Sequence, residues 1–174
     1  SGPININNDH SDAMGVRDAG WIMLFAETNQ EAYDNYLMAM RIAESVNLPI
    51  MICQDGFITS HAIENIDLVE TEDVKKFVGE RPLDHYLLKE DETMAVGAYA
   101  TPVYYMEAKR AQAQAMIDAK DSINKISKEF GDLTGRYYDL IEKYEMDDAE
   151  VAVVMIGSSA GTAKDTINEM RQAG

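Results

Sequence analysis

The sequence predicts an α/β fold built on a parallel β-sheet. Three short apolar runs have the length of buried strands, at residues 21–25, 48–53 and 151–156. A segment of helical periodicity separates the first two runs, and another follows the third, so strands and helices alternate along the chain. A strand–helix–strand order of this size is typical of a right-handed parallel crossover, which in turn requires a parallel sheet.

The helix of this first crossover is predicted from its cap and its apolar stripe. Thr28 and Glu31 have the spacing of a capping box, in which each side chain bonds the other residue's free backbone donor. Apolar residues then recur every three or four positions through about Val46, and Asn47 and Pro49 end the helix. The residues of the stripe are Tyr33, Tyr36, Leu37, Met40 and Ala43.

The middle of the chain is predicted to be mainly solvated and helical. Residues 64–92 are rich in acidic side chains and hold a short helix at Thr71–Val78. A long helix is expected from Tyr104 or Tyr105 to about residue 130, where Gly131 breaks it. A helix of this length can link two packing units.

The C-terminal part is predicted to contain an edge strand, a buried strand and a helix. Residues 138–144 alternate as an edge strand does, although a helical turn also fits them. The apolar run at 151–156 is expected to be a buried strand, followed by the loop 157–162 and a helix through Arg171.

Composition narrows the classes of function. The chain has 174 residues with 31 acidic and 15 basic side chains, a net charge of -16, which disfavours binding to nucleic acid or to anionic membranes. No apolar run has the length of a membrane span and no signal peptide is visible, so a cytoplasmic protein is expected. The single Cys53 is expected to be a buried, inert thiol.

Both ends of the sequence look cut. Ser1 and Gly2 resemble the residues left by tag removal, and Ile4–Asn8 begins like a strand with no lead-in. The last helix follows a strand for which little chain remains to supply neighbours. The sequence is therefore expected to be a fragment.

Polar side chains gather in two segments next to predicted strands. The segment 9–21 precedes the first apolar run, and the loop 54–61 with Asp55 follows the second. If Ile4–Asn8 is a strand, both segments lie at the carboxyl edge of the sheet, where α/β proteins bind ligands. Arg17 is the only Arg or Lys among the first forty residues and can hold a small carboxylate in two hydrogen bonds, or simply pair with Asp12 or Asp18.

Other motifs favour ordinary structural roles. The loop 157–162 can cradle a phosphate at a helix N-terminus, but it lacks the Walker lysine and equally fits a simple N-cap. His10, His61 and His85 show no metal-ligand spacing, so no metal is expected. Ser60 and His61 are adjacent and are expected to point apart, as neighbours on a strand do.

Three stretches of the chain resemble the alpha subunit of 2-oxoacid:ferredoxin oxidoreductases, the family that includes pyruvate:ferredoxin oxidoreductase. They are DHSDAMGVRDAGW at 9–21 with NQEAYD at 29–34, LPIMICQDGFITSH at 48–61, and LTGRYYDLIEKYEMDDAEVAVVMIGSSAGTAKDTINEMRQAG at 133–174. Because these motifs have the family's order and separation, the resemblance spans nearly the whole chain.

The resemblance implies an oxidoreductase that uses thiamine diphosphate and Mg²⁺. It would convert a 2-oxoacid, in the first place pyruvate, into acyl-coenzyme A and carbon dioxide, and pass electrons through iron–sulfur clusters to ferredoxin. In this family the diphosphate, metal and cluster sites belong to other domains or to the beta, gamma and ferredoxin-like delta subunits, and the activating glutamate lies upstream of residue 1. The fragment alone is expected to bind no cofactor and to be inactive, with a homodimer left open.

The resemblance also implies domains and site residues. Residues 1–132 would be the C-terminal part of a thiamine-diphosphate-binding, pyrimidine-type domain with a linking helix at about 105–130, and residues 133–174 the start of a transketolase C-terminal-like domain. Arg17 would orient the substrate carboxylate, with His10 and Ser11 shaping the same loop, and Asp55 either in the site or in a turn. Two rivals stay open: a subunit-assembly module with an acidic docking face, and a stand-alone nucleotide-binding protein.

Overall fold

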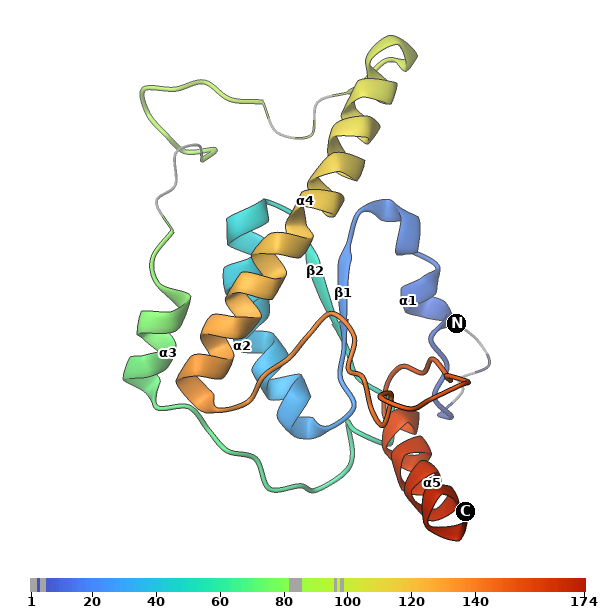
Figure 1. Ribbon diagram of the computed structural model, residues 1–174. Coiled ribbons are helices and arrows are strands. Elements are labelled where there is room, and N and C mark those ends of the chain that lie inside the picture. Colours follow the sequence, from blue (N-terminus) through green and yellow to red (C-terminus); the bar gives the residue numbers. More distant parts are fainter. Residues whose placement is uncertain (1–2, 4–5, 82–85, 96, 98) are drawn as a thin grey trace.

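The computed structural model describes residues 3, 6–81, 86–95, 97 and 99–174, and it confirms the α/β class. Strands β1 and β2 pair in parallel, with Ile22 opposite Ile50 and Phe25 opposite Cys53, and α2 connects them as the predicted crossover (Figure 1). The elements in chain order are α1 (Ser11–Met14), a 3₁₀ turn η1 (Arg17–Ala19), β1 (Ile22–Phe25), α2 (Asn29–Val46), β2 (Ile50–Cys53), α3 (Thr71–Val78), α4 (Pro102–Thr134) and α5 (Ser159–Ala173).

Only one of the two hydrogen bonds of the predicted capping box forms at the start of α2. The hydroxyl of Thr28 accepts a hydrogen bond from the Glu31 amide at 3.2 Å. The Glu31 carboxylate, however, accepts from the amide of Glu27 at 2.6 Å rather than from that of Thr28. The reciprocal bond is therefore shifted by one residue, and it fixes the turn that leads from β1 into α2.

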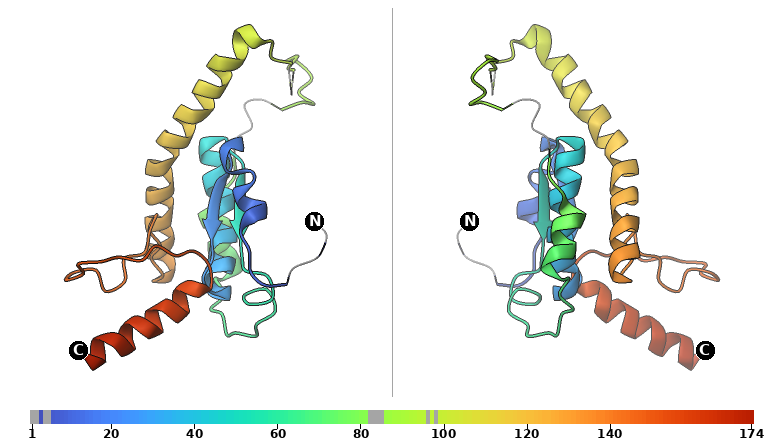
Figure 2. Two further views of the ribbon diagram at one scale, coloured as in Figure 1. Left: turned by 90° about the vertical axis from the view of Figure 1, so that its right-hand side faces the viewer. Right: turned by 90° about the vertical axis from the view of Figure 1, so that its left-hand side faces the viewer.

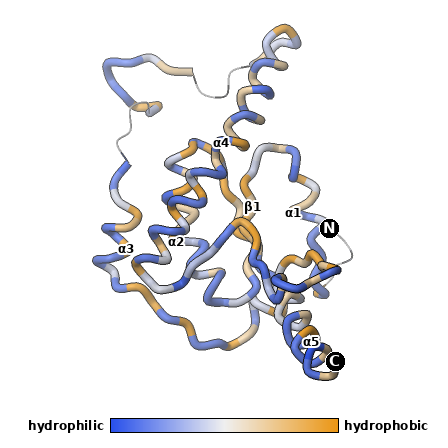
Figure 3. The backbone as a smooth tube through the Cα atoms, in the orientation of Figure 1, coloured by the Kyte–Doolittle hydropathy of each residue, from blue (hydrophilic) through white to orange (hydrophobic). Residues whose placement is uncertain are grey.

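The hydrophobic core lies where α2 packs against β2, α3 and α4. Strand β1 is hydrophobic along its length (Figure 3), and α4 and α1 lie on opposite sides of the sheet (Figure 2). The rings of Phe77 and Phe130 meet edge to face at 5.3 Å in this core. The buried core residues are Ile22, Met38, Ile42, Leu48, Phe77, Ala119, Ile126 and Phe130.

Helix α4 is longer than predicted at both ends. It begins at Pro102, because a proline in the first turn gives up only an amide that has no partner there. It passes through Gly131, where the ring of Tyr137 occupies the space that a Cβ would need. The helix ends at its C-cap residue Gly135, which has φ 77°. Only its later half contributes to the core, and its first turns project beyond the body of the molecule (Figure 1).

Two predicted strands are wrong. Residues 138–144 and 151–156 have no regular structure, and neither pairs with another strand in the described part of the chain. A strand needs a neighbour to satisfy its backbone, and the side chains of Val151 and Val154 are 85% and 89% exposed. At the N-terminus, residues 6–8 form no strand, and Ile4 and Asn5 lie outside the described residues.

Cys53 is half-buried rather than buried. Burial raises the pKa of its thiol, and the negative charge of Asp12 raises it further. The thiol therefore stays protonated at neutral pH, where a protonated thiol is a poor nucleophile.

One buried carboxylate attaches the chain beyond α4 to the core. Asp34 of α2 is fully buried and accepts hydrogen bonds from Arg136 Nε at 2.6 Å and Arg136 Nη2 at 2.8 Å. Tyr138 donates its hydroxyl at 2.6 Å and Gln30 its amide at 3.1 Å. Burial and the bond to Asp34 raise the pKa of Tyr138, which keeps this hydroxyl a donor. Asp34 thus exchanges its hydration for four protein donors.

Replacing Arg136 by Met should destabilise the fold by about 2–4 kcal/mol, because the Asp34 carboxylate would stay buried without its cation. Arg171→Met is the matched control: Arg171 pairs with Asp148 at 2.6 Å on the surface, and its loss should cost less than about 1 kcal/mol. Urea denaturation of the two variants measures the difference. Equal losses would mean that Asp34 does not hold the fold together.

Candidate functional site

The N-terminal polar segment runs alongside β1 and reaches both ends of the strand. At the carboxyl end, the ring of His10 meets the ring of Phe25 edge-on at 5.3 Å, and His10 Nε2 lies 4.0 Å from Asp55 Oδ1. Ser11 opens α1 beside it and donates its amide to Asp9 at 2.7 Å. Hydrogen bonds from the Ser11 side chain and amide lower the pKa of Asp9.

Arg17 lies at the opposite end of β1. It is in η1, which enters β1 at its amino end (Figure 1), so the structure does not bring Arg17 together with His10 and Asp55. Its side chain is 69% exposed, and its Nε lies 3.4 Å from Oδ1 of Asp18, one of the two partners considered from the sequence. Arg17 also lines a wide groove that follows β1 and the segment 137–157.

Asp55 joins the end of β2 to the start of α5. Its carboxylate is buried and accepts two hydrogen bonds of 2.6 Å, from the amide and the hydroxyl of Ser158. Gly157 has φ 75°, and a Cβ there would lie 2.5 Å from Asp55 Oδ1. The carboxylate thus occupies the place that an anion would take at this helix N-terminus.

The loop after β2 corrects the expectation for Ser60 and His61. Ser60 Oγ and His61 Nδ1 are 2.8 Å apart, because the segment forms a turn and not a strand. The ring of His61 stacks on Phe57 at 4.2 Å, and the Phe57 amide donates to Ser60 Oγ at 2.9 Å. Phe57 has φ 61°, an uncommon conformation for a bulky residue.

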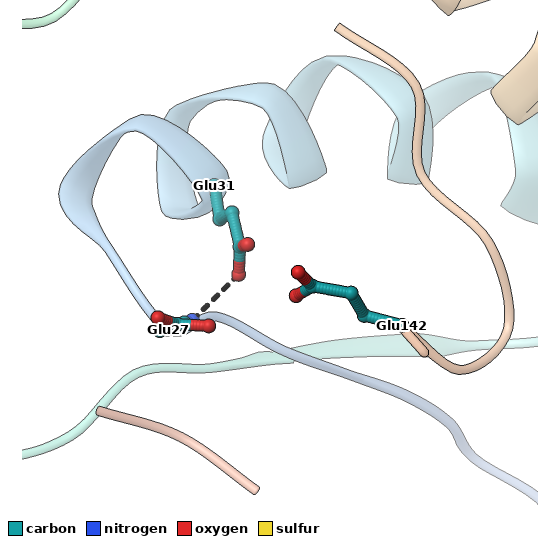
Figure 4. Close-up of side chains that lie close together, drawn as sticks. All are labelled: Glu27, Glu31 and Glu142. Atoms are coloured by element: carbon teal, nitrogen blue, oxygen red, sulfur yellow. Dashed lines mark hydrogen bonds between the residues drawn. The ribbon is translucent and has the colours of Figure 1, made fainter. Parts of the chain in front are cut away.

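A cluster of three carboxylates was missed in the sequence analysis, because Glu27 and Glu31 of the turn from β1 into α2 are joined there by Glu142, far along the chain. Glu27, Glu31 and Glu142 bring oxygens within 4.8 Å of one another (Figure 4). Burial raises the pKa of Glu31, although the hydrogen bond that its carboxylate accepts from the Glu27 amide partly offsets this rise. Lys164 of α5 donates to Glu27 at 2.7 Å and to Glu142 at 2.8 Å.

Lys164 already supplies the cation for this cluster. Burial alone would lower the pKa of Lys164, but its bonds to Glu142 and Glu27 raise it, so the ammonium stays charged between them. A metal ion at this place would have to displace Lys164 from two short bonds. The cluster is therefore an ion-pair anchor between α5 and the β1–α2 turn.

The described residues do not fit the diphosphate and metal half of a thiamine cofactor. The helix N-terminus that would take a diphosphate is occupied by Asp55, and two carboxylates of the acid cluster that would take Mg²⁺ are already paired with Lys164. Arg17, whose side chain is exposed, lines an open groove.

The chain belongs to the family described as pyruvate flavodoxin/ferredoxin oxidoreductase, thiamine diphosphate-binding, whose family model matches residues 1–128. This confirms the resemblance stated from the motifs.

Relatives among curated proteins extend the match to the whole chain. The pyruvate synthase subunit PorA of Thermotoga maritima is 48% identical over 100% of the chain, which covers 45% of that protein. PorA of Methanothermobacter thermautotrophicus is 39% identical over 100% of the chain and 46% of its own length. The ketoisovalerate oxidoreductase subunit VorA of Pyrococcus abyssi is 38% identical over 99% of the chain and 44% of its own length. The chain thus spans somewhat less than half of these relatives.

Among the helices that the structure describes, none is long and apolar enough to cross a membrane.

Gly157→Ala tests the contact between Asp55 and the start of α5. The strained φ and the collision with the carboxylate should together cost about 2–4 kcal/mol. Gly135→Ala is the control, since Gly135 has φ 77° but nothing within 4 Å of its Cβ position, and it should cost about 1–2 kcal/mol. Urea denaturation compares the two. If both variants lose the same stability, the Asp55 contact contributes nothing.

Proposed function

We propose that the chain is part of the alpha subunit of a thiamine-dependent 2-oxoacid:ferredoxin oxidoreductase, with pyruvate as its substrate. The family match over residues 1–128 and the 48% identity to a pyruvate synthase subunit support this assignment. The reaction joins the acyl group of the oxoacid to coenzyme A, releases carbon dioxide and passes electrons to ferredoxin. Iron–sulfur clusters, Mg²⁺ and the diphosphate site reside in other domains or in the beta, gamma and delta subunits of a cytoplasmic complex.

Arg17 orients the carboxylate of the oxoacid in this proposal. The supporting observation is that its exposed side chain lines the groove along β1, while Asp18, its partner among the described contacts, also lies on the surface. A planar guanidinium matches a carboxylate with two parallel hydrogen bonds and stays charged at every working pH. Fixing the carboxylate positions the neighbouring keto carbon for attack.

His10, Ser11 and Asp55 have a different part in this proposal. His10 Nε2 lies 4.0 Å from Asp55 Oδ1 at the carboxyl ends of β1 and β2. Asp55 accepts two hydrogen bonds from Ser158. These residues hold the polar segment and α5 in place, so that η1 presents Arg17 to the groove. They act as positioning residues and do not touch the substrate.

We also propose that residues 133–174 begin a second domain of the transketolase C-terminal type, while residues 1–132 belong to the pyrimidine-type domain. The supporting observation is the exposure of an unbroken apolar run, Val151–Ile156, in a chain that spans less than half of its relatives. An apolar run of this kind is stable in water only when other strands or helices cover it. Further chain of the kind that the relatives possess would supply that cover.

Arg17→Leu tests the substrate site in the assembled oxidoreductase. Loss of a charge-assisted bond pair should raise the KM for the 2-oxoacid roughly 10–100-fold, while the calorimetric affinity for thiamine diphosphate stays unchanged. Asp18→Asn is the control: it frees Arg17 from a surface pair and should leave KM within about twofold. Unchanged kinetics in Arg17→Leu would remove Arg17 from the site.

Hydrogen exchange tests the second domain. In the 174-residue chain the amides of residues 151–156 should exchange freely, and in a chain extended to the length of the relatives they should be protected. The amides of Ile50–Cys53 in β2 serve as the internal control, protected in both. Free exchange of residues 151–156 in the extended chain would overturn the domain assignment.

A further inference from the structure

A glutamine of α4 contacts the turn that carries Arg17. The side-chain amide of Gln112 donates a hydrogen bond to the backbone oxygen of Ala19 at 3.2 Å, across 93 positions of the chain. Ala19 is the last residue of η1, and η1 lies at the level where α4 leaves the body of the molecule (Figure 1). A carbonyl at the end of a helical turn has no partner within that turn, so Gln112 supplies the donor that it lacks.

The close approach of Gln112 explains the glycine that follows η1. Gly20 is buried and has φ 91°, in the left-handed region that favours glycine. A Cβ at Gly20 would collide with Nε2 of Gln112. The amide of Gln112 therefore lies directly against the backbone of the turn, which no other residue type at position 20 would allow.

Lys109 fixes which end of the Gln112 amide faces η1. Its ammonium donates a hydrogen bond to Oε1 of Gln112 from a position one turn earlier on α4. An ammonium can only donate, so it takes the oxygen end of the amide and leaves the NH₂ end for the carbonyl of Ala19. The bond from α4 to η1 thus has a defined direction.

The core-facing side of α4 provides a firm base for this bond. Gln112 lies four residues before Met116 and seven before Ala119, so it continues the side of the helix that packs on the core. Met116 and Arg17 both line the groove along β1. A half-buried polar residue thus takes the position where the buried stripe would otherwise continue, and it binds η1 instead of the core.

Without Gln112, η1 would be held only by the chain on either side of it. The other hydrogen bonds described for residues 16–19 stay within residues 13–20. The side chain of Arg17 gains little support of its own, because its pair with Asp18 lies on the surface. A turn with so few outside contacts opens easily, so the bond to α4 is what gives it a fixed place beside the groove.

We propose that Gln112 is a positioning residue, which sets where Arg17 stands at the groove. The inference rests on the proposed role of Arg17 toward the 2-oxoacid and adds a residue of α4 to that site. Gln112 does not touch the substrate: it holds the carbonyl of Ala19, and so the turn from which the guanidinium extends. A guanidinium on a fixed turn loses less freedom when it binds a carboxylate, which raises the affinity for the substrate.

Steady-state kinetics of the assembled oxidoreductase test the inference with a matched pair of variants. Gln112→Ala should raise the KM for the 2-oxoacid roughly 3–10-fold and leave kcat within about twofold, as expected for the loss of one hydrogen bond. Gln114→Ala removes the same side chain from a site where its described bonds go only to Arg110 and Asp118 of the same helix. This control should leave KM within about twofold. Equal effects of the two variants would overturn the inference.

The dependence on Arg17 separates positioning from a general loss of stability. In a chain that already carries Arg17→Leu, adding Gln112→Ala should change KM less than about twofold, since no guanidinium is left to position. A further rise as large as that in the wild-type chain contradicts the inference. A raised KM in Arg17→Leu but not in Gln112→Ala overturns this inference alone. Unchanged kinetics in Arg17→Leu overturn the proposed role of Arg17 first, and the inference with it.

Trp21, the only tryptophan of the chain, reports on the turn without any substrate. It follows Gly20 directly and is 38% exposed. In the 174-residue chain, Gln112→Ala should raise the acrylamide quenching of Trp21 at least about 1.5-fold, because η1 opens more often, whereas Gln114→Ala should leave it unchanged. Circular dichroism checks that both variants fold. Equal quenching in the wild-type chain and in Gln112→Ala would mean that Gln112 does not hold η1, which overturns the inference.

Discussion

The buried carboxylate of Asp34 is the constraint on which the arrangement of the chain beyond α4 depends. The hydrophobic core ends at Phe130, and Arg136 lies over the Phe130 ring, 5.8 Å from its centre, while it binds Asp34. The ion pair therefore closes the end of the core and aims the following segment back across α2. A carboxylate without water is costly to leave unpaired, so Arg136 and Tyr138 have little freedom to move away.

The same physical device is repeated further along the chain. Asp55 holds the first turn of α5 through Ser158, and Lys164 joins α5 to Glu27 and Glu142. No buried residue of α5 adds to these contacts. The C-terminal part is thus attached to the body by polar side chains that are specific in direction, whereas apolar contacts secure the crossover unit itself.

Signals that act over a few residues predicted the bounds of the helices well. Helix α2 begins after Thr28, and α3 has its predicted bounds, because caps and periodicity are local properties. The buried side of α2 was predicted wrongly: Tyr36 and Met40 of the predicted stripe are exposed, and the core takes Met38 and Ile42 instead, because the elements packed on the helix decide which side is covered. The strand predictions were wrong where a strand depends on a pairing partner. Residues 151–156 have the composition of a strand, but they pair with no other strand among the described residues. Ser60 and His61 were expected to point apart, as neighbours on a strand do, but both lie in a turn, where Ser60 Oγ and His61 Nδ1 are 2.8 Å apart.

The candidate site was harder to predict, since its contacts join residues far apart in the chain. Asp34 and Arg136 are separated by 102 positions, and Asp55 and Ser158 by 103. Neither pair shares a motif, so no spacing rule finds them. The sequence placed Arg17, His10 and Asp55 at one edge because it assumed a strand at Ile4–Asn8. Without a strand in residues 6–8, the polar segment runs past β1 and reaches both of its ends.

This separation decides how Arg17 can act. Its pair with Asp18 lies in water, with the Asp18 side chain 88% exposed, and such pairs contribute only about 0–1 kcal/mol. A substrate carboxylate that approaches the open groove would gain as little, because water screens both charges. Selective binding requires that another protein part cover η1 and exclude that water, which strengthens each hydrogen bond to the guanidinium. In the proposed function, therefore, the affinity of Arg17 for an oxoacid would be a property of the assembled site, and the isolated chain would supply the direction of the bond but not its strength.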